Sequence, residues 1–399
     1  MPLVWYRLFI GFITRFYFSR VKVIHPEHIP ANGPILFLGL HRNGAVDGLV
    51  HHTGLERPEF MISTQLVGGW FSRLFFHGIA VTRGKDRQGE RAANEAALGE
   101  CLELLRGGGR LFIYPEGTSS LGPRHLPFKM GAFRLLLDYL DAGGPELRVI
   151  PVGVHYERAW AFRAGVEIVA GAAISTELPG ATSHTERMRR LKNRAEEALA
   201  GVGINARSAE YQETIERIAS ISTVGTGRSW FRALKAMEED IPPAVLEAWR
   251  AFELETGGLL EWHGVPLFPR RPMLVDAALL IIMGPIVLGA ILLNLPPYLA
   301  GWIAAKRFAD DRNVISLWKI LAGVPILLVW SLIVLLILLV TWRPLALGAY
   351  GLITWLGWVF YDPAKRLAVS VLNAIRFPQL QSRYLALREL ILQTLEDEY

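Results

Sequence analysis

The sequence predicts an α/β domain followed by an all-α membrane region. Short apolar runs bounded by turn residues alternate with longer helical patterns over the first 200 residues, and this alternation is typical of α/β folds. Long uncharged stretches gather in the C-terminal third, although the whole chain is already 51% hydrophobic. At 399 residues the chain is long enough to hold both regions.

The chain begins with an aromatic and apolar segment over residues 3–18. Arg7 and Arg15 interrupt it, and two arginines make a full membrane crossing costly. The segment also lacks the cleavage-site pattern of a signal peptide. Residues 1–20 are therefore predicted to form a helix that either lies in the membrane interface with snorkelling arginines or packs on the domain core.

The α/β domain is predicted over residues 21–200. Short runs rich in aliphatic and aromatic residues predict strands over 21–23, 35–40, 60–64, 79–81, 111–114, 149–154 and 166–169. Longer amphipathic patterns predict helices over 67–76, 88–106, 128–140 and 183–200. Gly107–Gly109 ends the second of these helices, and this glycine run is a turn because it lacks the Gly-Lys-Ser/Thr of a phosphate-binding loop.

A polar helical spacer is predicted over residues 201–270, and a membrane-embedded region over 271–367. Ala277 to Ala305, Ile320 to Trp342 and Pro344 to Tyr361 contain no charged residue. A helix of 23 residues covers ~35 Å, enough for a hydrocarbon core of ~30 Å. Residues 368–399 repeat apolar side chains at helical spacing and are predicted to form an amphipathic helix that packs within the protein.

Basic clusters set the expected membrane topology. Arg270-Arg271, Lys306-Arg307 and Lys365-Arg366 flank the apolar stretches, and three plain crossings would put one cluster on the wrong side for the positive-inside rule. Hairpins that turn near 294–297 and 343–344 would keep all three on one face, with the first hairpin re-entrant. We expect the α/β domain to face the cytoplasm.

The charge balance and the single cysteine exclude several classes of protein. The net charge is +5, which suits an anionic lipid surface, and we find no motif of a nucleic-acid-binding domain. Cys101 stands alone, so an internal disulfide and a multi-cysteine metal site are both excluded. The histidines do not fall at ligand spacings on one element, and we predict no metal.

The residues that carry chemistry follow predicted strands. His41 comes directly after the run 35–40, and an imidazole that acts as a base needs a carboxylate to fix its tautomer, for which Asp47 is the nearest candidate. Arg83 follows the strand over 79–81, and Glu116-Gly117-Thr118 follows the strand over 111–114. Loop residues after strands are common places for side chains that meet a ligand.

These blocks, in this order, resemble the glycerolipid acyltransferase family over roughly residues 20–175. The blocks are His41 to Asp47, Gly78 to Gly84, Arg110 to Thr118, Phe128 to Gly131 and Val149 to Val154. The resemblance implies a mixed-sheet acyltransferase domain with flanking helices. It implies acyl transfer from acyl-CoA or acyl carrier protein as co-substrate, with no further cofactor, to 1-acyl-glycerol-3-phosphate in phospholipid biosynthesis at a lipid bilayer.

The resemblance also assigns roles to residues. His41 is implied to take the proton of the acceptor hydroxyl while Asp47 supports the imidazolium. Arg83 is implied to bind the acceptor phosphate, and Glu116, Gly117 and Thr118 the glycerol backbone. Lys129 is a further candidate for substrate binding, and Pro151 is implied to shape the groove for the acyl donor.

Two departures from the family pattern leave the acceptor open. Five residues separate His41 from Asp47 where four are usual, a spacing similar to that of the fungal-type glycerol-3-phosphate/dihydroxyacetone-phosphate branch, and Gly44 is a residue able to absorb the extra one. Ser119 stands where the family usually has arginine. Glycerol-3-phosphate or dihydroxyacetone phosphate is therefore the alternative acceptor. A serine hydrolase that uses Ser119 or Ser120 is a separate hypothesis, and so is a membrane scaffold without catalytic activity.

Overall fold

The computed structural model describes residues 4–56, 58–66, 68–69, 72–82, 90–178, 183–224, 226–255, 257, 259 and 266–396. Arg83 lies outside these residues. The chain divides into two compact units, which are described separately. The first comprises Met1–Phe16, Val21–His155 and Val166–Asn205, and the second Tyr17–Arg20, Tyr156–Gly165 and Ala206–Tyr399.

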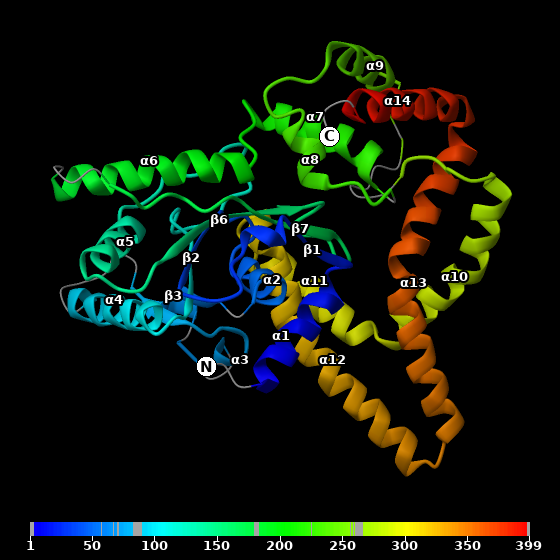
Figure 1. The fold of residues 1–399 in the computed structure, drawn as a ribbon. Coiled ribbons are helices and arrows are strands. Elements are labelled where there is room, and N and C mark those ends of the chain that lie inside the picture. Colours follow the sequence, from blue (N-terminus) through cyan, green and yellow to red (C-terminus); the bar gives the residue numbers. More distant parts are fainter. Residues whose placement is uncertain are drawn as a thin grey trace. The chain divides into compact units, whose positions relative to one another are not determined.

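A seven-stranded sheet is the centre of the first unit (Figure 1). Each strand forms where the apolar runs of the sequence predict one: β1 (Arg20–Ile24), β2 (Ile35–Gly39), β3 (Glu59–Ser63), β4 (Ile79–Val81), β5 (Arg110–Ile113), β6 (Arg148–Tyr156) and β7 (Gly165–Ala170). The strand order is β1-β7-β6-β2-β5-β3-β4. Every residue of β2 is buried, as expected for a strand in the middle of a covered sheet.

The sheet is mixed, as predicted. Strand β2 pairs in parallel with both β5 and β6, and β3 pairs in parallel with β4 and β5. Strands β6 and β7 are neighbours joined by only a short loop, too short for a parallel crossover, and the amide of Glu157 donates to the carbonyl of Gly165 at 3.0 Å. The parallel strands β2 and β5 therefore place their carboxyl ends at the same edge of the sheet.

Helices accompany the sheet in two stretches of the chain. Within the described residues of the first stretch lie α1 (Val4–Tyr17), α2 (Val46–Gly54) and α3 (Ser72–Phe75), and later come α4 (Glu90–Arg106), α5 (Gly131–Asp141) and α6 (His184–Val202). Helix α2 is absent from the sequence prediction. The helix predicted over 67–76 is much shorter in the structure, where only α3 forms within its described residues. The other helices lie close to their predicted positions.

Helix α1 packs on the domain core, one of its two predicted roles. Ile10 and Ile13 are fully buried, and the hydroxyl of Tyr6 donates to the carbonyl of Phe75 at 3.0 Å. Its opposite face carries large exposed side chains, among them Leu8 (71% exposed) and Phe12 (53% exposed). One apolar face of α1 therefore packs in the core of the domain, and a second apolar face is exposed.

The second unit contains a polar helical part and a group of long apolar helices. The polar part is α7 (Ala209–Thr223), α8 (Trp230–Lys235), α9 (Pro243–Glu253) and α14 (Pro378–Glu396), which pack together in Figure 1. Tyr384 and Ile391 of α14 are fully buried. The amphipathic C-terminal helix thus packs within the protein, as the sequence predicts.

Among the described residues, three helices of this unit are long and apolar enough to cross a membrane: Met273–Leu293, Arg312–Val340 and Pro344–Arg376. They correspond to α10 (Met273–Leu293), α12 (Ile315–Val340) with the short turn before it, and α13 (Pro344–Arg376). Between the first two lies α11 (Leu295–Phe308), whose 14 residues are too few for a crossing. The chain breaks at Asn294 and again at 341–343, close to the predicted hairpin turns, but the helices that flank each break do not pair with each other along their lengths as the hairpin prediction requires.

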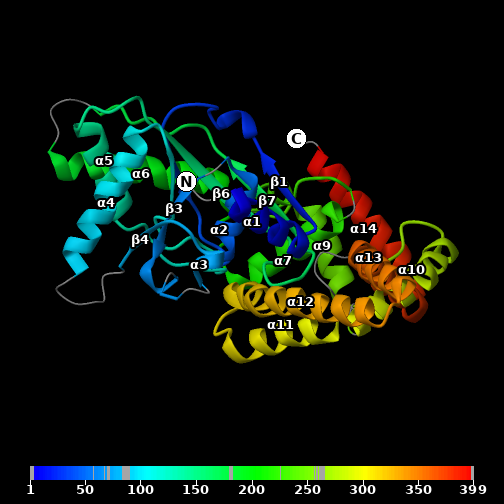
Figure 2. The ribbon, with the colours of Figure 1, turned by 90° about the horizontal axis from the view of Figure 1, so that it is seen from below.

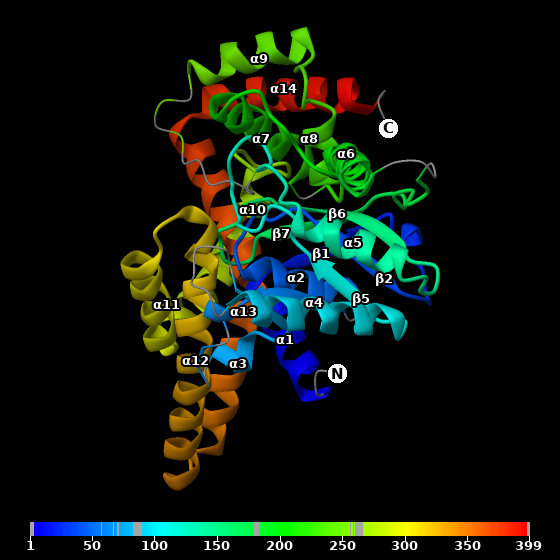
Figure 3. The same ribbon diagram turned by 90° about the vertical axis from the view of Figure 1, so that its left-hand side faces the viewer.

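These helices pair along their lengths. Helix α11 lies beside α12 (Figure 2), and α10 lies along α13 (Figures 1 and 3). Small residues permit the close approach, since a Cβ atom on Gly357 would lie only 2.1 Å from the Cβ of Ala290. The sequence prediction ends the membrane region at residue 367, whereas α13 runs on without a break to Arg376. The break before the C-terminal helix therefore lies after Arg376, whereas the prediction starts that helix at residue 368.

Candidate active site

The predicted pair of His41 and Asp47 meets at the carboxyl end of β2. The Nδ1 atom of His41 lies 2.9 Å from Oδ2 of Asp47, and the carboxylate is fully buried while His41 remains 8% exposed. The same Oδ2 accepts hydrogen bonds from the backbone amides of Arg42 (2.6 Å) and Asn43 (2.9 Å). These contacts fix the carboxylate, which in turn holds Nδ1 as the protonated nitrogen and leaves Nε2 to exchange a proton.

A tight turn and a new helix bring the two side chains together. Gly44 has a φ angle of +52°, a left-handed conformation that costs glycine little. The amide of Asp47 then donates to the carbonyl of Gly44, and Asp47 lies in the first turn of α2, where a carboxylate is favoured. The predicted use of Gly44 to absorb a five-residue spacing matches this geometry.

An aromatic ring supports His41 from one side. The imidazole stacks on Tyr114 with ring centroids 4.1 Å apart and planes inclined by 16°. The hydroxyl of Tyr114 shares a hydrogen bond of 2.9 Å with Nδ1 of His51, which comes from α2. Burial lowers the pKa of His51 to about 4 and raises that of Tyr114, so both groups are neutral at pH 7. Neither residue is a predicted site residue, because their contacts join segments far apart in sequence.

Glu116 lies at the same level as His41. The register of the parallel strands pairs Leu38 with Ile113, and His41 and Glu116 each follow by three residues. Glu116 is only 2% exposed, and its Oε1 atom accepts no hydrogen bond from the described residues. Nδ1 of His125 lies 3.7 Å from that oxygen. Burial raises the pKa of the Glu116 carboxyl to about 7, an effect that the charge of Arg42 partly opposes.

Two contacts join the loop after β5 to the loop after β2. The amide of Ser120 donates to the carbonyl of His41 at 2.9 Å, and the guanidinium of Arg42 donates to the carbonyl of Gly122 at 2.9 Å. The hydroxyl of Ser120 accepts a hydrogen bond from the amide of Gly122. The Glu116 segment and the His41 segment are therefore held as one structure.

Lys129 covers Gly117. The amide of Lys129 donates to the carbonyl of Pro115 at 2.8 Å, and a Cβ atom on Gly117 would lie 2.6 Å from Nζ of Lys129. Gly117 also has a φ of +70°, so the backbone conformation favours glycine here, whereas the flexible Lys129 side chain is able to move aside. Thr118 is exposed beside it. The structure thus brings Lys129 to the predicted Glu116–Thr118 block.

Arg83 and Pro151 are the remaining predicted positions. Arg83 lies outside the described residues. Pro151 lies within β6, opposite Leu38 of β2, and is buried in the sheet. Among the residues that the structure describes, no group of three or more His, Cys, Asp or Glu side chains is arranged to hold a metal ion.

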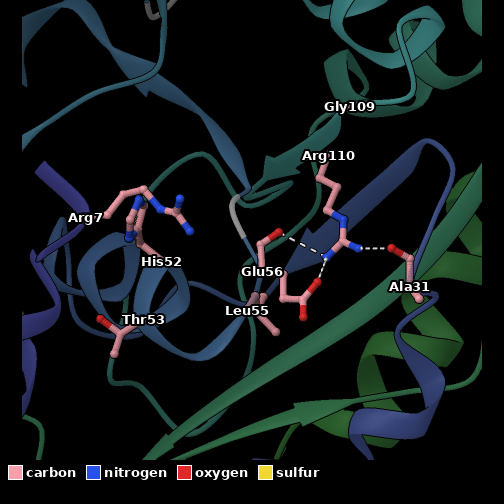
Figure 4. Close-up of a pocket in the computed structure, with 8 residues that line it drawn as sticks. All are labelled: Arg7, Ala31, His52, Thr53, Leu55, Glu56, Gly109 and Arg110. Atoms are coloured by element: carbon pink, nitrogen blue, oxygen red, sulfur yellow. Dashed lines mark hydrogen bonds and ion pairs between the residues drawn. The ribbon is translucent and has the colours of Figure 1, made fainter. Parts of the chain in front are cut away.

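A cavity of about 630 Å³ lies away from this site (Figure 4). Arg110, the first residue of β5, and Glu56, just after α2, line it, so it opens at the end of β5 opposite to Glu116. The guanidinium of Arg110 is already bonded to the carbonyls of Pro30, Ala31 and Glu56. The guanidinium of Arg110 is therefore occupied by backbone carbonyls, and none of the predicted site residues lines the cavity. For these two reasons we do not place the active site there.

The site therefore holds a histidine that is supported by a buried carboxylate at the edge of an α/β sheet. Residues 20–155 match the model of the Acyltransferase family. The chain is an O-acyltransferase, in agreement with the sequence prediction.

A similar solved structure is that of the 1-acyl-sn-glycerophosphate (LPA) acyltransferase PlsC from Thermotoga maritima. It is 20% identical, and the similarity covers 49% of this chain and 79% of that chain with a TM-score of 0.34. No curated protein sequence matches.

The raised pKa of Glu116 predicts a pH-dependent stability difference. The folded protein holds this proton up to about pH 7, whereas the unfolded chain releases it near 4.5, so the stabilisation is present below 4.5 and is lost as the pH rises through 7. Glu116→Gln stays neutral throughout. We expect its unfolding midpoint to match wild type at pH 4 and exceed it by roughly 5 °C at pH 8. Glu146→Gln, at an exposed glutamate, is the control; equal midpoints at both pH values would contradict the prediction.

Two substitutions separate the contacts of Tyr114, which we predict to be a positioning residue. Tyr114→Phe retains the stacking but removes the partner of His51, so unfolding free energy should fall by about 1–3 kcal/mol with little change in kcat. Tyr114→Leu also removes the flat ring, and kcat should fall by about tenfold. Kinetics over a pH series should show an altered kcat profile for Tyr114→Leu alone. Equal kcat profiles for both variants would assign Tyr114 a structural role only.

Proposed function

We propose that the chain is a membrane-bound acyltransferase that transfers a fatty acyl group from acyl-CoA or acyl carrier protein to the free hydroxyl of 1-acyl-glycerol-3-phosphate. The observation that carries this proposal is the 2.9 Å contact between His41 and buried Asp47, beside Glu116, in a domain of the Acyltransferase family. That arrangement supplies a base held in one tautomer at the edge of the sheet.

In the proposed reaction, Nε2 of His41 takes the proton of the acceptor hydroxyl as its oxygen attacks the thioester carbonyl carbon. The tetrahedral intermediate then breaks the carbon–sulfur bond, and the departing thiolate takes the proton back from the imidazolium. Asp47 stabilises the imidazolium that exists between the two steps. The ester forms without an acyl-enzyme intermediate.

The other site residues are proposed to bind the acceptor. Glu116, whose pKa lies near 7, can accept from or donate to a glycerol hydroxyl, and the absence of a Cβ at Gly117 allows the backbone to approach it closely. Lys129 lies over Gly117 with its ammonium available to a phosphate, and Arg83 is assigned the same ligand by the family resemblance.

The apolar helices support attachment to a bilayer. Large side chains on them are exposed in the isolated chain, including Leu288 (58%), Leu332 (53%) and Leu336 (52%), and three helices among the described residues are long enough to cross. Soluble proteins do not expose apolar surface of this extent, so we infer that lipid covers it. An acceptor that is itself a lipid is then the natural substrate, and the catalytic domain is proposed to face the cytoplasm.

An assay with two acceptors and two donors tests the proposal. Full-length protein in lipid nanodiscs would receive lysophosphatidate or glycerol-3-phosphate, each with labelled acyl-CoA or acyl carrier protein. Product from lysophosphatidate supports the proposal. Product from glycerol-3-phosphate alone would instead support the second candidate, which the five-residue spacing between His41 and Asp47 favours. No product from any pair would support a scaffold.

A further inference from the structure

Three cationic side chains converge on one tryptophan in the second unit. The guanidinium carbons of Arg158 and Arg312 each lie 5.3 Å from the ring centroid of Trp160, and Nζ of Lys319 donates to the Trp160 carbonyl at 2.9 Å. Arg158 and Trp160 belong to the loop between β6 and β7, whereas Arg312 and Lys319 stand at the start of the candidate span Arg312–Val340. Two distant segments therefore build one basic cluster.

The cluster is held in place by bonds within this unit. Ser316 donates from its hydroxyl to the carbonyl of Ala159 at 2.5 Å, and the hydroxyl of Tyr17 bonds to Ser316 at 3.1 Å. Both contacts are buried. The loop that carries Arg158 and Trp160 is thus fixed to the helix that carries Lys319, which keeps the backbones of these residues close together.

No side-chain ion pair offsets the charge of the cluster within the described part of the chain, and the carboxylate of Asp311 accepts from the backbone amide of Arg312 at 2.5 Å. Arg158, Arg312 and Lys319 form no ion pair with any described carboxylate, and Nε of Arg158 is buried without a hydrogen-bond acceptor. Burial and the nearby charge of Arg312 both lower the pKa of Arg158. By contrast, Arg207 stacks on Tyr211 at 4.0 Å but also pairs with Asp240 at 3.2 Å. Cationic side chains that gather at a fixed place without a side-chain ion pair suit an anionic ligand.

The position of the cluster selects the kind of anion. The span Arg312–Val340 has 29 residues and would be ~43 Å long, which exceeds a hydrocarbon core of ~30 Å and reaches the headgroup layers. Its first residues then lie among lipid headgroups, the level at which tryptophan is also enriched. We propose that Arg158, Arg312, Lys319 and Trp160 form a binding site for the phosphate of an anionic membrane phospholipid. This inference rests on the proposed membrane integration and is independent of the acyl-transfer site.

Lipid titration of the full-length protein tests the site. Protein in nonionic detergent micelles would be titrated with phosphatidylglycerol, and the shift in unfolding midpoint would give a half-saturating concentration. Arg158→Gln and Arg312→Gln should each raise that concentration about fivefold, and the double variant about 25-fold. Arg207→Gln is the matched control and should leave it unchanged. Arg312 is exposed, so its variant decides the matter even if Arg158→Gln fails to fold.

Further titrations distinguish a phospholipid phosphate from a soluble phosphate. Phosphatidylcholine should give no saturable shift, and neither inorganic phosphate nor coenzyme A should displace phosphatidylglycerol. Equal responses in Arg312→Gln and Arg207→Gln, or displacement by coenzyme A, would overturn the proposal. The acyl-transfer assay is read separately: an active protein without lipid selectivity contradicts only this inference, and an inactive protein with selectivity contradicts only the proposed function.

Discussion

Replacing His41 with alanine is expected to lower kcat by about 10²–10⁴-fold, because general-base assistance contributes a factor of that size. Nδ1 of His41 is bound by Asp47 at 2.9 Å, so Nε2 is the nitrogen that can take the proton of the acceptor hydroxyl. Binding of the donor and the acceptor does not depend on this nitrogen, so KM for each should change only a few-fold.

The measurement is initial-rate kinetics with labelled acyl donor, using full-length protein in nanodiscs. His184→Ala provides the control, since His184 is exposed on α6 and remote from the candidate site in sequence. A His41→Ala enzyme that keeps more than a tenth of wild-type kcat would remove the base from the mechanism. Labelling of Ser120 by a fluorophosphonate probe would then favour a serine hydrolase.

The strands and the edge that carries the site could be predicted because they depend on local sequence. The run 35–40 is continuous and apolar between turn residues, and buried central strands require that pattern. Two parallel strands followed by polar residues place those residues at one edge, which is why His41 and Glu116 lie at the same level of that edge. The contact of His41 with Asp47 could also be predicted, because it requires a tight turn between the two residues and Gly44 is able to form that turn.

The contact between Tyr114 and His51 beside His41 could not be predicted from the sequence, for a physical reason. The 2.9 Å bond between Tyr114 and His51 joins positions 63 residues apart, and it depends on helix α2, whose nine residues carry few helix signals of their own. Helix α2 begins with Ala45 in place of a capping side chain. Its stability comes from packing of Leu49 and Val50, a tertiary effect that local propensity does not report.

Helix α13 extends past residue 368, where the sequence predicts a new helix, because of side-chain contacts along the helix. Pro363 and the pair Lys365-Arg366 suggest that an apolar helix should stop before residue 368. In the structure, Asp362 pairs with Lys365 at 3.2 Å and with Arg366 at 2.9 Å along the same helix. These i,i+3 and i,i+4 contacts satisfy the charges without leaving the helix, so the backbone continues to Arg376.

Substitution of Asp47 is expected to have the second large effect on kcat. Two substitutions separate the role of its charge from the role of its hydrogen bonds. Asp47→Asn keeps an oxygen that can accept from the amides of Arg42 and Asn43, but a neutral amide cannot stabilise an imidazolium on His41. We expect kcat to fall by about 10²–10⁴-fold, with the unfolding midpoint changed little. Asp47→Ala removes the acceptor altogether and leaves two buried amides unsatisfied. It should lose the same activity and, in addition, about 2–4 kcal/mol of unfolding free energy.

Kinetics and thermal unfolding of the two variants, measured on the same preparations, separate charge from hydrogen bonding. Asp138→Asn is the control, because Asp138 forms a partly exposed ion pair with Arg134 on α5. If Asp47→Asn retained kcat within tenfold of wild type, the charge on Asp47 would be unnecessary and the proposed imidazolium intermediate would be wrong. If Asp47→Ala were as stable as Asp47→Asn, the three hydrogen bonds to Oδ2 would contribute nothing to folding. Loss of activity without loss of stability in Asp47→Asn is the outcome that ties the buried carboxylate to proton transfer.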